Sequence, residues 1–66
     1  MDAYKMLAHV AREIDKIRGD QISVLADGRA SDHAEYRHIC GVIRGLSFAE
    51  NIINDLVQRM EKAEND

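Results

Sequence analysis

The sequence predicts an all-α fold, an antiparallel two-helix hairpin that self-associates into a four-helix or larger bundle. Three observations favour it. The chain has no proline, one break interrupts its apolar pattern, and that pattern has a helical period on both sides of the break. We interpret residues 1–66 as one helical-hairpin domain, with a first helix over about 2–26, a turn at 27–31 and a second helix over about 32–64.

In the first segment, the pattern positions recur at alternating spacings of three and four. They are Ala3, Leu7, Val10, Ile14, Ile17, Gln21 and Val24, of which only the glutamine is polar. This heptad pattern is typical of a helix that packs on another helix. The stretch "ADGRASD" (26–32) ends it, and Gly28 suits a left-handed residue just past the helix end.

The second segment begins with helix-capping residues. Asp32, followed three positions later by Glu35, resembles a capping box, with Ser31 as the alternative cap. The apolar series that follows is Ile39, Val42, Leu46, Ala49, Ile53, Leu56, Met60 and Ala63. Further residues widen this stripe: Tyr36, Ile43 and Val57 flank one side, and Gly45 and Ile52 flank the other. Such a broad stripe is typical of a bundle helix.

The unequal lengths of the two helices predict an overhang. Folding about the turn centre places Ile17 near Cys40 and Leu7 near Glu50, so the second helix extends about two turns beyond the start of the first. The residues then left with little to pack on in their own chain are Leu56, Val57, Met60 and Ala63. A hairpin of this size has a small core. We therefore expect a homo-oligomer, most simply of two hairpins.

Two glycines lie inside the second predicted helix, where each costs roughly 1 kcal/mol relative to alanine. Gly41, Gly45 and Ala49 recur every four residues, and such a stripe lets another helix approach closely. It predicts a contact between chains; the alternative is a helix break or kink near 41–45. The expected interface residues are Gly41, Gly45, Ala49, Ile52, Leu56, Val57 and Met60.

Composition narrows the classes of partner. The net charge is −3, which favours neither nucleic acid nor an anionic membrane. The apolar runs are too short for a membrane span, and the first residues do not form a secretory signal. The one cysteine excludes an internal disulfide framework and fits a reducing compartment.

Glu35 and His38 have the spacing at which two helical side chains reach one metal ion, and Asp20 falls roughly opposite them. The interpretation we favour makes Glu35 a cap and His38 a solvated residue, so we expect no metal and no cofactor. Cys40 lies between Arg37 and Arg44, which would favour a thiolate, but we expect a buried structural cysteine. No catalytic triad, phosphate loop or zinc spacing is present, and we expect no enzyme.

A cluster near the start of the second helix combines cationic and aromatic side chains: Arg29, His33, Tyr36, Arg37 and Arg44. Arginine forks and an aromatic face at a helix N-terminus suit a phosphate-bearing ligand. Because Asp27, Asp32 and Glu35 are interleaved with them, the alternative is an ordinary solvated face.

The run "LADGRASDHAEYRHICGVIRGL" followed by "AENIINDLVQRME" resembles a group of short proteins encoded by tailed, mostly short-tailed, bacteriophages. Their pattern is Gly-x-Ala-x-Asp-x-x-Glu-Tyr, then Gly-x-Ile-x-Gly-Leu and a helical tail with acidic residues at its end. The matching residues are Gly28, Ala30, Asp32, Glu35, Tyr36, Gly41, Ile43, Gly45 and Leu46. The resemblance covers most of 25–61. It implies a phage origin and, because such genes lie near head and connector genes, a role in the virion or its assembly.

These observations predict a non-enzymatic phage protein that acts as an oligomeric helical interaction module. We expect a phage or host protein as partner, and a location in the host cytoplasm or the virion. The alternative is an anti-host or anti-defence protein that sequesters an anionic nucleotide signal or inhibits a host enzyme.

Overall fold

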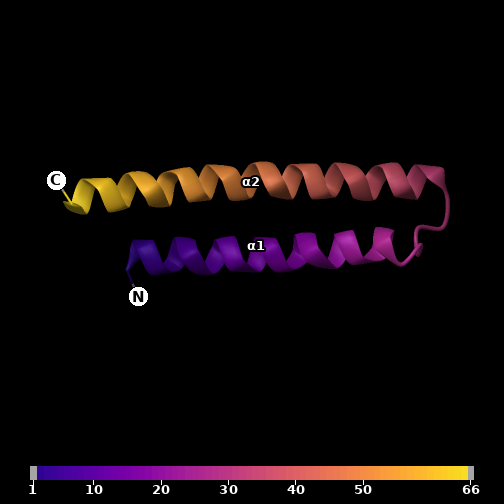
Figure 1. The fold of residues 1–66 in the computed structure, drawn as a ribbon, viewed down its shortest axis with the longest axis horizontal. Coiled ribbons are helices and arrows are strands. Elements are labelled where there is room, and N and C mark those ends of the chain that lie inside the picture. Colours follow the sequence, from indigo (N-terminus) through magenta and orange to yellow (C-terminus); the bar gives the residue numbers. More distant parts are fainter. Residues whose placement is uncertain (1, 66) are drawn as a thin grey trace.

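The computed structural model describes residues 2–65 and contains two α-helices, α1 (Ala3–Ala26) and α2 (His33–Asn65), joined by a short loop. The helices run antiparallel and lie side by side, with the chain ends at one end of the hairpin and the loop at the other (Figure 1). The molecule is a rod of 51 × 18 × 14 Å. The all-α hairpin predicted from the sequence is confirmed.

Hydrogen bonds at both ends of α1 fix its limits. Asp2 is the N-cap, and its Oδ1 accepts a hydrogen bond of 2.8 Å from the Lys5 amide. At the other end, Gly28 has a φ of 68°. The amides of Gly28 and Arg29 donate to the carbonyls of Leu25 and Val24, at 3.1 and 2.9 Å. This pair of bonds is a Schellman motif, and it requires the left-handed conformation that glycine adopts without strain.

The start of α2 is a capping box displaced by one residue. Asp32 is the cap, because its Oδ1 accepts from the Glu35 amide at 2.8 Å. The Glu35 carboxylate reaches back to Ser31, where it accepts from the amide at 3.0 Å and also from the hydroxyl. A standard capping box would return this bond to the cap residue itself. Each helix therefore begins one residue later than predicted, after an aspartate cap.

α2 passes through Gly41 and Gly45 as one continuous helix (Figure 1). Among the described residues only Gly28 has a positive φ. The alternative of a helix break near 41–45 is therefore wrong.

The register between the helices differs from the predicted one. Nε of Arg18 lies 2.9 Å from Oε1 of Glu50, and the Tyr4 hydroxyl donates to Oε1 of Glu61 at 2.6 Å. Glu50 was predicted to lie near Leu7, about three turns away from Arg18 along α1. Helical side chains lean toward the N-terminus of their own helix, so in an antiparallel pair they meet partners of higher residue number. The loop also extends one residue further than predicted.

This register shortens the overhang. Val57 and Met60 are half-buried, and α2 extends only about one turn beyond the Tyr4–Glu61 contact. The prediction that these two residues would find little to pack on in their own chain is wrong. Leu56, 43% exposed, does remain outside the contact.

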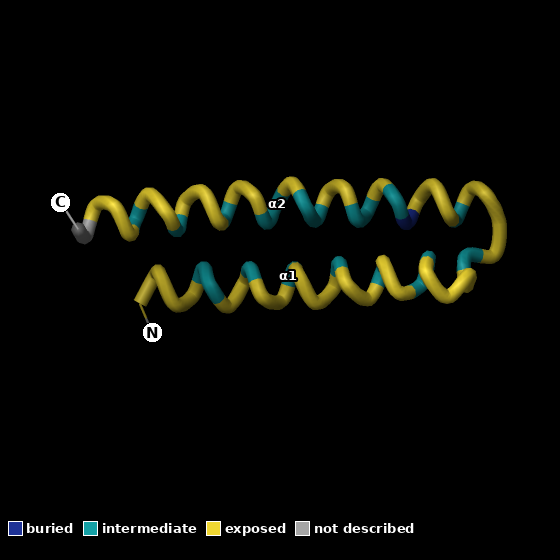
Figure 2. The backbone as a smooth tube through the Cα atoms, in the orientation of Figure 1, coloured by how far each residue is buried: buried dark blue, intermediate teal, exposed yellow. Residues whose placement is uncertain are grey.

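The half-buried residues of both helices lie along the sides that face each other (Figure 2). We call these contacting positions the seam rows. On α1 they are Leu7, Ile14 and Gln21, with Ala11, Arg18 and Leu25 beside them; Tyr4 continues the second row at the open end but is exposed. On α2 they are Ile39, Leu46, Ile53 and Met60, with Ile43, Glu50 and Val57 beside them. Among the described residues only Ile39 is buried, at 5% exposure.

The seam is therefore rotated relative to the prediction. Val10 and Ile17 were expected in it but are 43% and 49% exposed, and their places are taken by Ala11 and Arg18. The rotation occurs because Arg18 reaches across to Glu50, so that an ion pair lies where two apolar side chains were expected.

Candidate functional site

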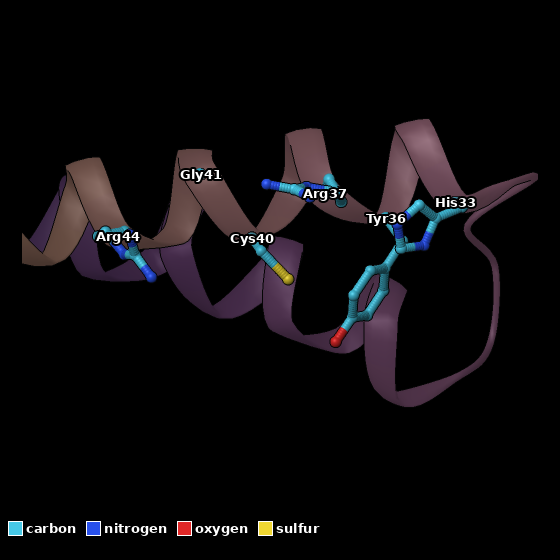
Figure 3. A pocket seen from close by; sticks show the side chains of 6 residues that line it. All are labelled: His33, Tyr36, Arg37, Cys40, Gly41 and Arg44. Atoms are coloured by element: carbon cyan, nitrogen blue, oxygen red, sulfur yellow. The ribbon is translucent and has the colours of Figure 1, made fainter.

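A hollow of about 430 Å³ lies along the outer surface of α2 near the loop (Figure 3). Its lining residues are His33, Tyr36, Arg37, Cys40, Gly41 and Arg44. They recur at spacings that place helical residues on one face. Four of the five predicted ligand-binding residues therefore come together here. Arg29 does not, because it lies in the loop, where its guanidinium is 3.4 Å from an Asp27 carboxylate oxygen.

Two kinds of group line this hollow. At the loop end the rings of His33 and Tyr36 stack, with centroids 6.2 Å apart and an interplanar angle of 22°. Further along α2 the side chains of Arg37 and Arg44 lie on either side of Cys40 (Figure 3). Within the described part of the chain, neither arginine forms an ion pair. The arrangement presents two cationic forks and an aromatic surface to solvent, which suits a small anion with a planar group.

Two acidic residues near the hollow, Asp32 and Glu35, form hydrogen bonds at the start of α2. Asp32 caps α2 through the Glu35 amide, and the Glu35 carboxylate binds Ser31. The bond from the Ser31 hydroxyl, and after it the bond from the Ser31 amide, lowers the pKa of Glu35 below its usual value. Glu35 therefore stays ionised as a structural group.

Cys40 is a free cysteine and is half-buried. It is one of the residues that line the hollow (Figure 3). Cys40 is therefore less buried than expected, because it lies outside the seam rows; its structural role stays a prediction.

The suggested metal grouping of Asp20, Glu35 and His38 does not assemble. No group of three or more potential metal ligands occurs among the described residues, and Glu35 serves the cap instead.

The predicted interface residues divide into two sets. Ala49, Val57 and Met60 are half-buried, and Val57 and Met60 belong to the seam rows. Gly41 and Gly45 are exposed, and a Cβ atom on either would meet nothing within 4 Å. Ile52 and Leu56 are 66% and 43% exposed. The hairpin alone gives no packing reason for either glycine.

Beside the seam rows, each helix carries one further row in which every residue is apolar. On α1 the row is Ala3, Val10, Ile17 and Val24; on α2 it is Val42, Ala49, Leu56 and Ala63. Val10 precedes the seam residue Ala11 by one position, and Leu56 precedes Val57 in the same way. Because the helices are antiparallel, this equal backward step leads to the same side of the hairpin in both. The two rows together form what we call the apolar side face.

The opposite side of the seam is polar. There Arg18 contacts Glu50, and its guanidinium also donates to Asp15 at 2.8 Å. These acids, Asp15 first and then Glu50, raise the pKa of Arg18. The Arg18 Nε and Glu50 Oε1 atoms are shielded from solvent and have no hydrogen-bond partner among the described residues, so their contact is ionic rather than an aligned hydrogen bond.

Sequence reasoning missed this ion pair and also missed Phe48. Phe48 is 67% exposed and lies one turn before Ile52 on the outer surface of α2. Its i, i+4 spacing from Ile52 was the available signal. The ion pair had no comparable signal, because it depends on the register between the helices.

No family model matches this chain. No curated protein and no solved structure matches it either. None of the described helices is both long enough and apolar enough to cross a membrane.

Proposed function

We propose that this chain is a non-enzymatic bacteriophage protein that acts as an oligomeric helical interaction module, as a minor virion component or in particle assembly. The observation that carries the proposal is the apolar side face, on a hairpin with one buried residue among those described. Five of its eight residues are exposed, and Val24, Val42 and Ala49 are half-buried. Apolar surface that is left open in this way marks sites of protein interaction. The host cytoplasm and the virion are the locations that follow from this role.

The assignment to phage proteins rests on the sequence resemblance alone. Three residues of the shared pattern build the hairpin turn: Gly28 with its positive φ, Asp32 as the cap and Glu35 on Ser31. These contacts give a physical reason for the pattern, because each residue is needed to reverse the chain.

The experiment is mass spectrometry of purified particles of the encoding phage, combined with deletion of the gene. We expect the chain in the particles, or defective particles from the deletion mutant. Particles that lack the chain, together with a deletion mutant that yields normal particles, would contradict the proposal.

A second candidate function is favoured by the hollow on α2: binding of an anionic nucleotide signal, with the chain acting against the host. Arg37 and Arg44 line this hollow beside the stacked rings of His33 and Tyr36. Ligand binding raises the melting temperature in proportion to the logarithm of ligand concentration once the site is saturated.

This candidate is tested by thermal melts with a panel of cyclic nucleotides. It requires a melting temperature of the parent chain that rises with nucleotide concentration, and a loss of this rise in Arg44→Gln. Arg29→Gln is the matched control, because Arg29 lies outside the hollow, and it should keep the rise. No rise with any nucleotide, or an equal rise in both variants, would exclude this site.

A further inference from the structure

The contact between α1 and α2 uses only half of the heptad pattern. The other half forms the apolar side face. Residues at alternating three and four spacings form two adjacent rows on each helix. On α1, one of these rows (Leu7, Ile14, Gln21) faces α2, whereas the other (Ala3, Val10, Ile17, Val24) lies beside the contact. A helix that uses both rows has neighbours on two sides, which is the position of a helix in a four-helix bundle.

The two sides of the seam differ in chemistry. One side is closed by the Arg18–Glu50 pair and the Tyr4–Glu61 hydrogen bond. The apolar side face contains no charged residue among its eight positions. Two copies of a chain with a net charge of −3 repel each other. Contact through this face brings no charged side chains of the face together, so it adds no local repulsion.

The hairpin exposes more surface than a compact monomer of its mass, which leaves area for an interface of ordinary size. The chain exposes 5143 Å², whereas a compact monomer of its 7.5 kDa mass exposes about 4250 Å². The excess is about 900 Å², and a standard protein interface buries about 800 Å² on each partner. The radius of gyration of 15.2 Å likewise exceeds the value of about 11 Å expected for a compact chain of this length.

We propose that a second copy of this chain covers the apolar side face, and that the two hairpins form a four-helix bundle with two-fold symmetry. The same face on both copies then forms one self-complementary interface. This inference rests on the proposed function, and it identifies a second copy of the chain as one partner of the interaction module. It makes the bundle core from Val10, Ile17 and Leu56 together with the seam rows.

Gly45 and Ile52 lie at the outer edge of this interface, in the row next to Ala49 and Leu56. Gly45 has open space around it in the hairpin, and Ile52 is 66% exposed. In the bundle, Ile52 extends the apolar contact, and Gly45 leaves room for the backbone of the second copy.

The test is sedimentation equilibrium of the full chain at micromolar concentration, with two matched isoleucine variants. Ile17→Glu places a charge in the apolar side face. Ile22→Glu makes the same change at a residue of similar exposure, 43% against 49%, which lies outside that face. We expect a dimer of twice 7.5 kDa for the parent and for Ile22→Glu, and a dissociation constant raised by about a hundredfold or more for Ile17→Glu.

Circular dichroism of each variant shows whether it has kept its helices. If Ile17→Glu unfolds, the milder Ile17→Ala serves instead, and it should weaken association by about tenfold or more with the helices retained. A monomeric parent chain, an assembly of an odd number of chains, or equal effects of Ile17→Glu and Ile22→Glu would overturn the proposal.

The two proposals fail separately. A monomeric chain that is found in purified particles would refute the second copy and the oligomeric part of the proposed function, and would leave the role in the virion standing. A dimer that is absent from particles, in a phage whose deletion mutant assembles normally, would refute the proposed function alone.

Discussion

The start of α2 is held by two hydrogen bonds to the Glu35 carboxylate, one from the amide of Ser31 and one from its hydroxyl. Both favour the ionised carboxylate, the hydroxyl contact most strongly, so the pKa of Glu35 is lowered on folding. A group with a lowered folded pKa stabilises the folded state above its unfolded pKa. Its contribution is lost as the pH falls through the folded pKa.

We therefore expect the Glu35 carboxyl to titrate below the ordinary value of 4.5, and the helix start to weaken as the pH falls from that value through the lowered pKa. Ser31→Ala removes the largest cause of the shift and should move the midpoint up. Carbon-detected NMR titration of the Glu35 carboxyl measures both. An unchanged midpoint in Ser31→Ala would show that the hydroxyl does not hold the carboxylate.

At the scale of the helices, Arg18 and Glu50 are the ion pair that joins α1 to α2. Glu50 is 15% exposed at its side chain, so loss of its partner leaves a shielded charge uncompensated. We expect Arg18→Met to lower the melting temperature. Arg18→Met combined with Glu50→Leu should recover most of the loss, because both charges are then removed together. A double variant no more stable than Arg18→Met would argue against the register described here.

The glycines of α2 give a second prediction at this scale. Gly19 on α1 and Gly45 on α2 both have open space around them in the hairpin, so either change to leucine should gain about 1 kcal/mol of helix propensity. For Gly19→Leu we expect this gain, as a melting temperature raised by roughly 4–8 °C. For Gly45→Leu we expect a lower melting temperature and weaker association, because overpacking at the interface costs about 1–3 kcal/mol.

Thermal melts at two protein concentrations distinguish the cases. If Gly45→Leu is stabilised as much as Gly19→Leu and stays associated, then Gly45 is not in a contact between chains. Gly45→Ala should give a smaller loss than Gly45→Leu, since it adds a single methyl group.

At the scale of the whole molecule, the hairpin is a rod 51 Å long. Two copies that meet along the apolar side face should double the mass and thicken the rod without lengthening it much. Small-angle X-ray scattering should therefore give a maximum dimension close to that of one hairpin and a larger cross-sectional radius. A particle nearly twice as long would instead indicate end-to-end contact, which the apolar side face does not provide.

The hairpin and its turn could be predicted because their signals are local. Gly28 and Asp32 act through bonds to residues a few positions away. The seam was harder, because the heptad pattern marks every apolar row without saying which neighbour covers it. The pattern therefore assigned Val10 and Ile17 to the contact with α2, from which both are turned away.

Four residues of the hollow were predicted as a cluster from their cationic or aromatic type and their closeness in the sequence, and they lie together because they share one face of one helix. Arg29 could not be placed in this way, because the Schellman turn that precedes it decides where its side chain lies. Contacts between helices, such as Tyr4 with Glu61, depend on the register, and no local signal in the sequence sets it.

The position of Ile39, about two turns into α2 from the loop, has a consequence for the order in which the hairpin forms. The entropy lost on closing a loop grows with the number of residues between the contacting groups. Contacts around Ile39 enclose a short segment, whereas Tyr4 and Glu61 are 57 residues apart. Folding should therefore begin at the loop and proceed toward the chain ends, and amide hydrogen exchange should be slowest near Ile39 and fastest at the open end. The end that holds Tyr4 and Glu61 is then the last to close and the first to open.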